Sequence, residues 1–127
     1  MLFHIFRSQD ERRAYGGSAF LELQFCCLPP GTPIAKIVDS IECWKNDSLY
    51  VDDENSFYNI YSHIFSGGTY ANLQTGIVDL YGINYYSPSL TQHILEQVIL
   101  EKPTDCKILC EWLKKAGSYN GFYILGL

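Results

Sequence analysis

The chain has 127 residues, of which 47% are hydrophobic and 18% are charged, and its formal net charge at pH 7 is −5. These values are typical of one globular domain and exclude a disordered chain. No apolar stretch approaches the ~20 residues that span a bilayer, and the negative charge disfavours direct binding to DNA or RNA. We therefore expect a single domain over residues 1–127 that contacts neither membranes nor nucleic acids.

The amino-terminal part of the chain predicts two strands joined by a loop. Residues 2–6 are apolar and lack the basic leader of a signal peptide, so they predict a first strand. Residues 7–17 are polar and predict a loop. Residues 19–28 predict a half-buried strand, because every second residue is apolar. The apolar face of that strand contains Leu21, Leu23, Phe25 and Cys27.

The middle of the chain predicts two helices with a short strand at 49–51 between them. Thr32 followed by Pro33 is typical of a helix start, because a hydroxyl caps the helix and proline suits its first position. Apolar residues then keep helical spacing: Ile34, Ile37, Val38, Ile41 and Trp44. A second apolar stripe follows three carboxylates and is expected to end at Gly67-Gly68: Phe57, Ile60, Tyr61 and Ile64.

The carboxyl-terminal part predicts a hairpin, two helices and a last strand. Residues 69–73 and 77–86 are expected to pair around a turn at 74–76. Ser89 with Gln92 predicts a capping box, Thr104 is expected to cap the next helix, and Gly117 to follow its end. Trp112 completes an apolar stripe on that last helix and is expected in the core. Residues 122–127 predict a buried strand. We therefore predict an α+β fold with a mainly antiparallel or mixed sheet and about four helices packed on it.

The five cysteines are odd in number, and Cys26 and Cys27 are adjacent. Without a signal peptide, we expect free and mostly buried thiols in a reducing cytoplasm. Cys106 and Cys110 lie four residues apart on a predicted helix and could bind zinc together with His93. Because no fourth ligand accompanies them, we expect neither a metal nor an organic cofactor.

No set of residues predicts catalysis. Cys106 lies near a helix start, where a thiolate would be stabilised, yet no base is placed beside it by the sequence. His4 and His63 fall within apolar or aromatic segments and predict structural roles. The neighbouring carboxylates Asp52, Asp53 and Glu54 are more typical of helix capping than of glycoside chemistry. We expect that the protein is not an enzyme.

Acidic and tyrosine side chains are mixed within nine residues of the chain. Tyrosine offers a large rigid contact area with a polar tip, and carboxylates beside it attract a basic partner. The residues that we expect to bind such a partner are Tyr50, Asp52, Asp53, Glu54 and Tyr58. Asp39 and Glu42, on the preceding predicted helix, form a second candidate group.

In size, acidity, reduced cysteines and this mixture of acids and tyrosines, the chain resembles the immunity proteins of bacterial contact-dependent growth-inhibition and polymorphic toxin systems. The resemblance implies a cytoplasmic protein-binding inhibitor, or antitoxin, that neutralises a cognate toxin domain, for example a nuclease. It implies no fold and no particular site residue. The alternative is a small cytosolic enzyme or ligand-binding domain whose site is assembled from distant residues.

Overall fold

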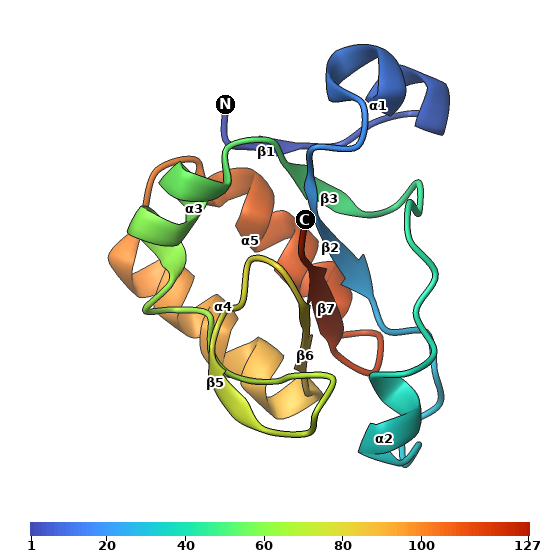
Figure 1. The fold of residues 1–127 in the computed structure, drawn as a ribbon. Coiled ribbons are helices and arrows are strands. Elements are labelled where there is room, and N and C mark those ends of the chain that lie inside the picture. Colours follow the sequence, from blue (N-terminus) through green and yellow to red (C-terminus); the bar gives the residue numbers. More distant parts are fainter.

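The computed structural model describes residues 1–127, and its centre is one antiparallel sheet in the order β1–β3–β2–β7–β6–β4–β5 (Figure 1). The seven strands are β1 (Phe3–His4), β2 (Leu21–Phe25), β3 (Leu49–Val51), β4 (Ser66–Thr69), β5 (Thr75–Ile77), β6 (Ile83–Tyr86) and β7 (Phe122–Leu125). The five helices are α1 (Gln9–Gly16), α2 (Ile34–Ile37), α3 (Glu54–Tyr61), α4 (Pro88–Glu101) and α5 (Cys106–Ala116). The predicted α+β fold with a mainly antiparallel sheet is confirmed.

The main hydrophobic core lies between one face of the sheet and the helices α3, α4 and α5. The apolar face of β2 contributes to it, and Leu23 pairs with Ile124 of the central strand β7. Trp112 of α5 is only 3% exposed and stacks on Phe25, with ring centroids 4.3 Å apart. The prediction that Trp112 is a core residue is therefore confirmed. The longest helix, α4, has 14 residues, and none of the helices is long and apolar enough to cross a membrane.

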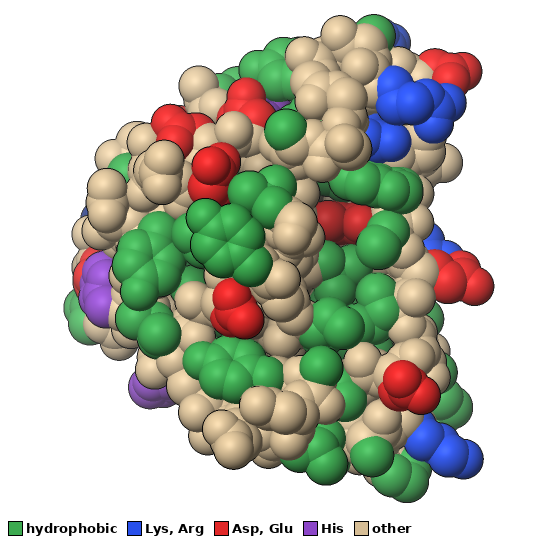
Figure 2. Space-filling view, in the orientation of Figure 1, with side chains coloured by type: hydrophobic (Ala, Val, Ile, Leu, Met, Phe, Trp, Pro, Cys, Tyr) green, Lys and Arg blue, Asp and Glu red, His purple; other side chains and the backbone are tan.

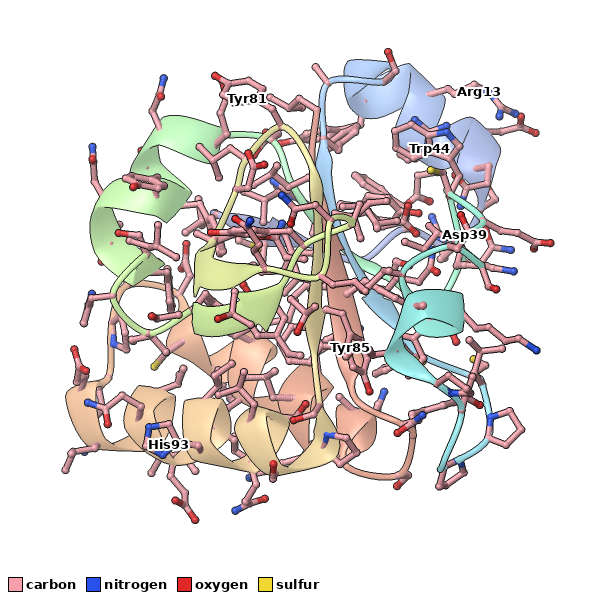
Figure 3. All side chains as sticks on the ribbon, turned by 60° about the horizontal axis from the view of Figure 1, so that its bottom comes forward. Arg13, Asp39, Trp44, Tyr81, Tyr85 and His93 are labelled. Carbon is pink, nitrogen blue, oxygen red and sulfur yellow. The ribbon has the colours of Figure 1, made fainter.

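The opposite face of the sheet is also covered, so β2 is buried on both sides instead of one. α2 packs there on Cys26, Tyr85 and Tyr123, and the Tyr123 hydroxyl donates a hydrogen bond to the carbonyl of Ile37. Figure 3 shows Tyr85 between the sheet and α2. A second small cluster joins Phe6, Phe20 and Tyr50 beneath α1 and the loop that precedes β3.

Glu22 places a carboxylate in this second interface, where it is buried and accepts four hydrogen bonds. Two come from the backbone N–H groups of Trp44, at 2.7 Å, and Lys45, at 2.9 Å. The others come from the Ser48 hydroxyl, at 2.6 Å, and the Gln24 amide, at 3.1 Å. The carboxylate thus fixes the path of residues 42–48 across the sheet.

This interaction explains why the helix predicted from Pro33 does not extend to Trp44. α2 ends at Ile37, and Trp44 takes a left-handed conformation with φ of 68°. Because Glu22 accepts the N–H groups of Trp44 and Lys45, these groups make no helical hydrogen bonds. Trp44 is only half-buried, beneath the Arg12 guanidinium at 3.9 Å, so its predicted place in a helical stripe is wrong. Thr32 donates to the carbonyl of Pro29 and does not cap the helix.

The polar segment that predicted a loop instead forms helix α1. Ser8 caps it, since its hydroxyl accepts a hydrogen bond from the N–H of Glu11. The spacing of Ser8 and Glu11 is that of a capping box, and this signal in the sequence outweighs the scarcity of apolar residues. Arg12 is the buried residue of the helix, and it packs its guanidinium on Trp44.

Several other boundaries differ from the prediction by a few residues. Gly67 and Gly68 do not end a helix but lie in β4. A side chain at position 68 would clash with the Tyr86 ring, because its Cβ would lie less than 3 Å from that ring. The hairpin turn covers residues 70–74, ahead of the predicted position. Ser87, and not Ser89, caps α4, and Asp105, and not Thr104, precedes α5. The predicted final strand and the role of Gly117 at the end of α5 are confirmed.

Replacing Glu22 by Gln should destabilise the protein by about 2–3 kcal/mol, because hydrogen bonds to a buried charged acceptor are the strong ones and an amide cannot accept all four. Urea unfolding measures this change. Glu42→Gln is the matched control, since Glu42 is exposed, and should change stability by less than about 0.5 kcal/mol. Equal stabilities of the two variants would contradict the anchoring role of Glu22.

Candidate functional site

Positive charge is absent from the middle of the chain. Between residues 46 and 101 there is no Lys or Arg, although this segment builds β3, α3, β4, β5, β6 and α4. It carries seven carboxylates: Asp47, Asp52, Asp53, Glu54, Asp79, Glu96 and Glu101. Figure 2 shows acidic side chains beside hydrophobic ones over α3 and the loop before β6, whereas Lys and Arg gather over α1 and α2. The remaining four lysines follow α4 or lie on α5: Lys102, Lys107, Lys114 and Lys115. The start of α3 and the loop before β6 therefore carry acids without any Lys or Arg of their own.

The start of α3 presents the predicted acidic segment. Asp53 is its N-cap: one carboxylate oxygen accepts the N–H of Ser56 at 3.0 Å and the other accepts the Ser56 hydroxyl at 2.7 Å. These hydrogen bonds hold the pKa of Asp53 below its usual range, so the group is ionised at neutral pH. Phe57 and Tyr61 turn into the core and fix the helix, which leaves Tyr58 on its outer side.

The loop of residues 78–82, between β5 and β6, lies beside α3 and is held rigidly. The buried side-chain amide of Asn84 accepts the N–H of Asp79 and donates to its carbonyl, both at 2.8 Å. The same amide also donates to the carbonyl of Ile124 at 3.0 Å, which ties the loop to the central strand β7. The Asp79 carboxylate accepts the N–H of Tyr81 at 2.9 Å and so shapes the turn.

A cleft of about 340 Å³ opens between this loop and α3, and we name it the Tyr58–Tyr81 cleft. Both buried Val78 and Tyr81, which is 74% exposed and labelled in Figure 3, line it. Its lining residues are Asn55, Tyr58, Asn59, Val78, Asp79, Leu80 and Tyr81. The cleft therefore combines two phenol rings, two amides and one carboxylate.

The two tyrosines of the cleft differ from the other eight. Six of those eight donate hydroxyl hydrogen bonds to backbone carbonyls: Tyr50, Tyr61, Tyr70, Tyr85, Tyr86 and Tyr123. The remaining two, Tyr15 and Tyr119, pack on other aromatic rings. Tyr58 and Tyr81 have neither a hydroxyl partner nor an aromatic neighbour within the chain. Tyr58 is half-buried against the main core and Tyr81 is 74% exposed, and the hydroxyls of both remain available to a partner.

Most of the predicted contact residues lie on this side of the molecule. Asp52, Asp53 and Glu54 lead into α3, and Tyr58 lines the cleft. Tyr50 does not belong to this surface: it is fully buried, its hydroxyl donates to the carbonyl of Lys45 at 2.6 Å, and burial raises its pKa to about 12. The prediction that Tyr50 is a contact residue is therefore wrong, because its side chain belongs to the opposite face of β3.

The second predicted group lies elsewhere. Asp39 and Glu42 follow α2, which packs at the other side of the sheet from α3 (Figure 1). Both are exposed, but Glu42 pairs with Lys45 at 2.8 Å, and this hydrogen bond lowers the pKa of Glu42. The structure therefore does not bring the two acidic groups together into one surface.

Two histidines have carboxylate partners that are distant in sequence. His4 Nε2 lies 3.0 Å from Asp52 Oδ1, and His63 Nε2 lies 2.6 Å from Glu101 Oε1. Neither histidine has a hydroxyl or thiol as a second hydrogen-bond partner, so neither pair forms a nucleophile–base arrangement. The His4–Asp52 pair instead links β1 to the segment that leads into α3.

The cysteines are all free, but the prediction that most are buried is wrong. Cys26 alone is buried, Cys106 and Cys110 are half-buried, and Cys27 and Cys43 are exposed. Partial desolvation raises the pKa of Cys27, Cys43 and Cys110. No three His, Cys, Asp or Glu side chains converge, so His93 does not meet the two cysteines of α5.

The cleft residues Asp79 and Tyr81 were not predicted from local motifs. A signal was nevertheless present, because the run of residues 46–101 without Lys or Arg includes both. Its meaning depends on folding, since only the sheet brings the 78–82 loop beside α3.

Comparison with protein-family models, with curated proteins and with solved structures finds no match to this chain. Its function is therefore inferred from the chemistry of the surface described above.

Thiol titration of the native protein should show two groups that react first, Cys27 and Cys43, and roughly five groups after unfolding. Because the pKa of both exposed thiols is raised, a smaller fraction of each is thiolate at pH 8. Their reaction rates should therefore be lower than that of a free cysteine at pH 8 and should continue to increase at higher pH. The double variant Cys27→Ser, Cys43→Ser should lose this fast phase. Fast reaction of Cys26 in the folded protein would contradict its burial.

Replacing Asn84 by Ala should destabilise the protein by about 1–3 kcal/mol, because it leaves buried backbone groups of Asp79 and Ile124 without partners. Hydrogen exchange should also become faster at the amide of Asp79. Asn59→Ala is the matched control, since that side chain is exposed and makes no hydrogen bond within the chain. Unchanged exchange at Asp79 would show that Asn84 does not hold the loop.

Proposed function

We propose that this chain is a protein-binding inhibitor, an immunity protein of a bacterial toxin system, that acts in the cytoplasm by occupying a basic toxin domain. The observation that carries the proposal is the composition of α3 and the 78–82 loop, which are acidic, aromatic and free of Lys and Arg. The proposal requires no cofactor and no catalytic residue.

The physical properties of this surface suit an inhibitor. Carboxylates at the start of α3 would attract a basic partner and raise the rate of encounter. Tyr58 and Tyr81 then offer large rigid side chains, which are common among the residues that dominate binding energy. The Asp53 cap fixes α3, and the hydrogen bonds of Asn84 fix the 78–82 loop, so both walls of the cleft are rigid before binding. Little conformational entropy is therefore lost on association.

The gene neighbourhood and coexpression test this proposal. We expect a secreted toxin to be encoded beside the gene, and cells that express its toxic domain should survive only when this chain is coexpressed. The purified pair should form a stable complex in gel filtration. A neighbouring toxin that remains lethal and does not bind this chain would contradict the proposal, as would a locus that encodes only metabolic enzymes.

A charge variant of the α3 start should separate binding from folding. We choose Asp52→Lys, Asp53→Ser and Glu54→Lys, because serine at position 53 retains a capping hydroxyl. Folding should be retained, whereas association with the toxin should slow by about tenfold or more and lose most of its dependence on salt. Stopped-flow kinetics and cell survival measure both effects.

The matched control reverses the other acidic group, Asp39→Lys with Glu42→Lys, on the far side of the sheet. This control should still protect cells. If the folded α3 variant protects cells fully and the control does not, the binding surface lies on the α2 side.

A further inference from the structure

The Tyr58–Tyr81 cleft has the composition of a site for one cationic side chain, and this inference rests on the function proposed above. We infer that the cleft receives a single arginine side chain of the toxin, whose guanidinium lies against the phenol rings and beside Asp79. The surrounding carboxylates of the α3 start would guide that side chain in, while the cleft would select it.

The first argument is the unused bonding capacity of the cleft. One Asp79 oxygen accepts the N–H of Tyr81, and the other has no hydrogen-bond partner within the chain. The side-chain amides of Asn55 and Asn59 also make no internal hydrogen bond, and neither do the hydroxyls of the two tyrosines. The rim therefore presents carboxylate, amide and hydroxyl oxygens as acceptors. A planar guanidinium has five donors in a fixed arrangement, which suits several acceptors around one hollow better than an ammonium group does.

The second argument is the apolar part of the cleft. Val78 and Leu80 line it together with the two phenol rings, which no other aromatic side chain covers. A methylene stem can pack on the aliphatic residues while the charged end meets the ring faces. Arginine is the cationic side chain most often found on aromatic faces, which again favours it over lysine.

The third argument is that no charge of the chain competes for the cleft. Three acidic side chains elsewhere already have cationic partners: Glu11 with Arg7, Asp10 with Arg13, and Glu42 with Lys45. Asp79 has no ion pair, and no Lys or Arg occurs in the segment that contains it. An incoming cation therefore replaces water alone and breaks no internal salt bridge.

The test uses small probes and the intact chain. N-acetyl-arginine methylamide is titrated to about 50 mM while amide shifts are followed by NMR, at ionic strength held constant with NaCl because exposed charges are screened. The neutral citrulline analogue has nearly the same shape and is the matched probe. Arginine should shift the amides of Asn55, Asn59, Asp79 and Tyr81, and citrulline should bind about two- to fivefold more weakly.

Variants of the chain complete the experiment. Tyr81→Leu should weaken binding of the arginine probe by about two- to fivefold. Asp79→Asn retains an oxygen for the Tyr81 N–H and should remove most of the preference for arginine over citrulline, whereas Asp39→Asn should change neither quantity. Equal binding of both probes to the wild type, shifts confined to other surfaces, or no shift at all would overturn the cleft assignment.

The outcome can be separated from that of the proposed function, since the probes require no toxin. If arginine does not enter the cleft while the α3 charge variant still loses protection, the cleft assignment is wrong and the inhibitor proposal stands. If arginine binds as expected but no toxin is neutralised, the cleft remains a cation site and the inhibitor proposal is wrong.

Discussion

The fold depends on the burial of β2 on both faces, because that strand carries a carboxylate into the interior. A buried charge without partners would be very unfavourable, and here Glu22 is satisfied by four donors instead of a counter-ion. Two of these donors are consecutive backbone N–H groups, so the loop that contains them must bend around the carboxylate. The same bend keeps residues 44 and 45 out of a helix and places Trp44 under Arg12. A single side chain thus decides how the second face of the sheet is closed.

The charges of the surface are arranged differently on the two sides of this sheet. On the side of α1 and α2, most cations are held by acids three or four residues away, and Arg12 packs on an aromatic ring. On the other side, the lysines follow α4 or lie on α5, whereas α3 and the 78–82 loop carry acids without Lys or Arg, beside two tyrosines that the fold does not need for hydrogen bonding. The absence of internal cations from α3 and the 78–82 loop is the physical basis for proposing the binding surface there.

The candidate site is built from groups that are rigid before any partner arrives. The helix cap at Asp53 and the amide of Asn84 belong to elements that the main core holds in place, since Phe57 anchors α3 and Asn84 lies in β6 beside β7. Where a loop becomes ordered only on binding, that ordering weakens affinity. A cleft whose walls are already fixed avoids much of this loss, which suits an inhibitor that must remain bound for a long time.

The sequence by itself determined the fold class, the main apolar stripes and the acidic start of α3, because these depend on periodicity and on neighbours along the chain. Trp112, the apolar face of β2 and the final strand could be assigned in this way. The sequence did not determine the length of α2, the burial of Tyr50 or the pairing of His4 with Asp52, since each depends on a partner far along the chain. The cleft also depends on residues distant in sequence. Tyr58 and Tyr81 are 23 positions apart, and only the antiparallel sheet brings the 78–82 loop, which contains Tyr81, beside α3, which contains Tyr58.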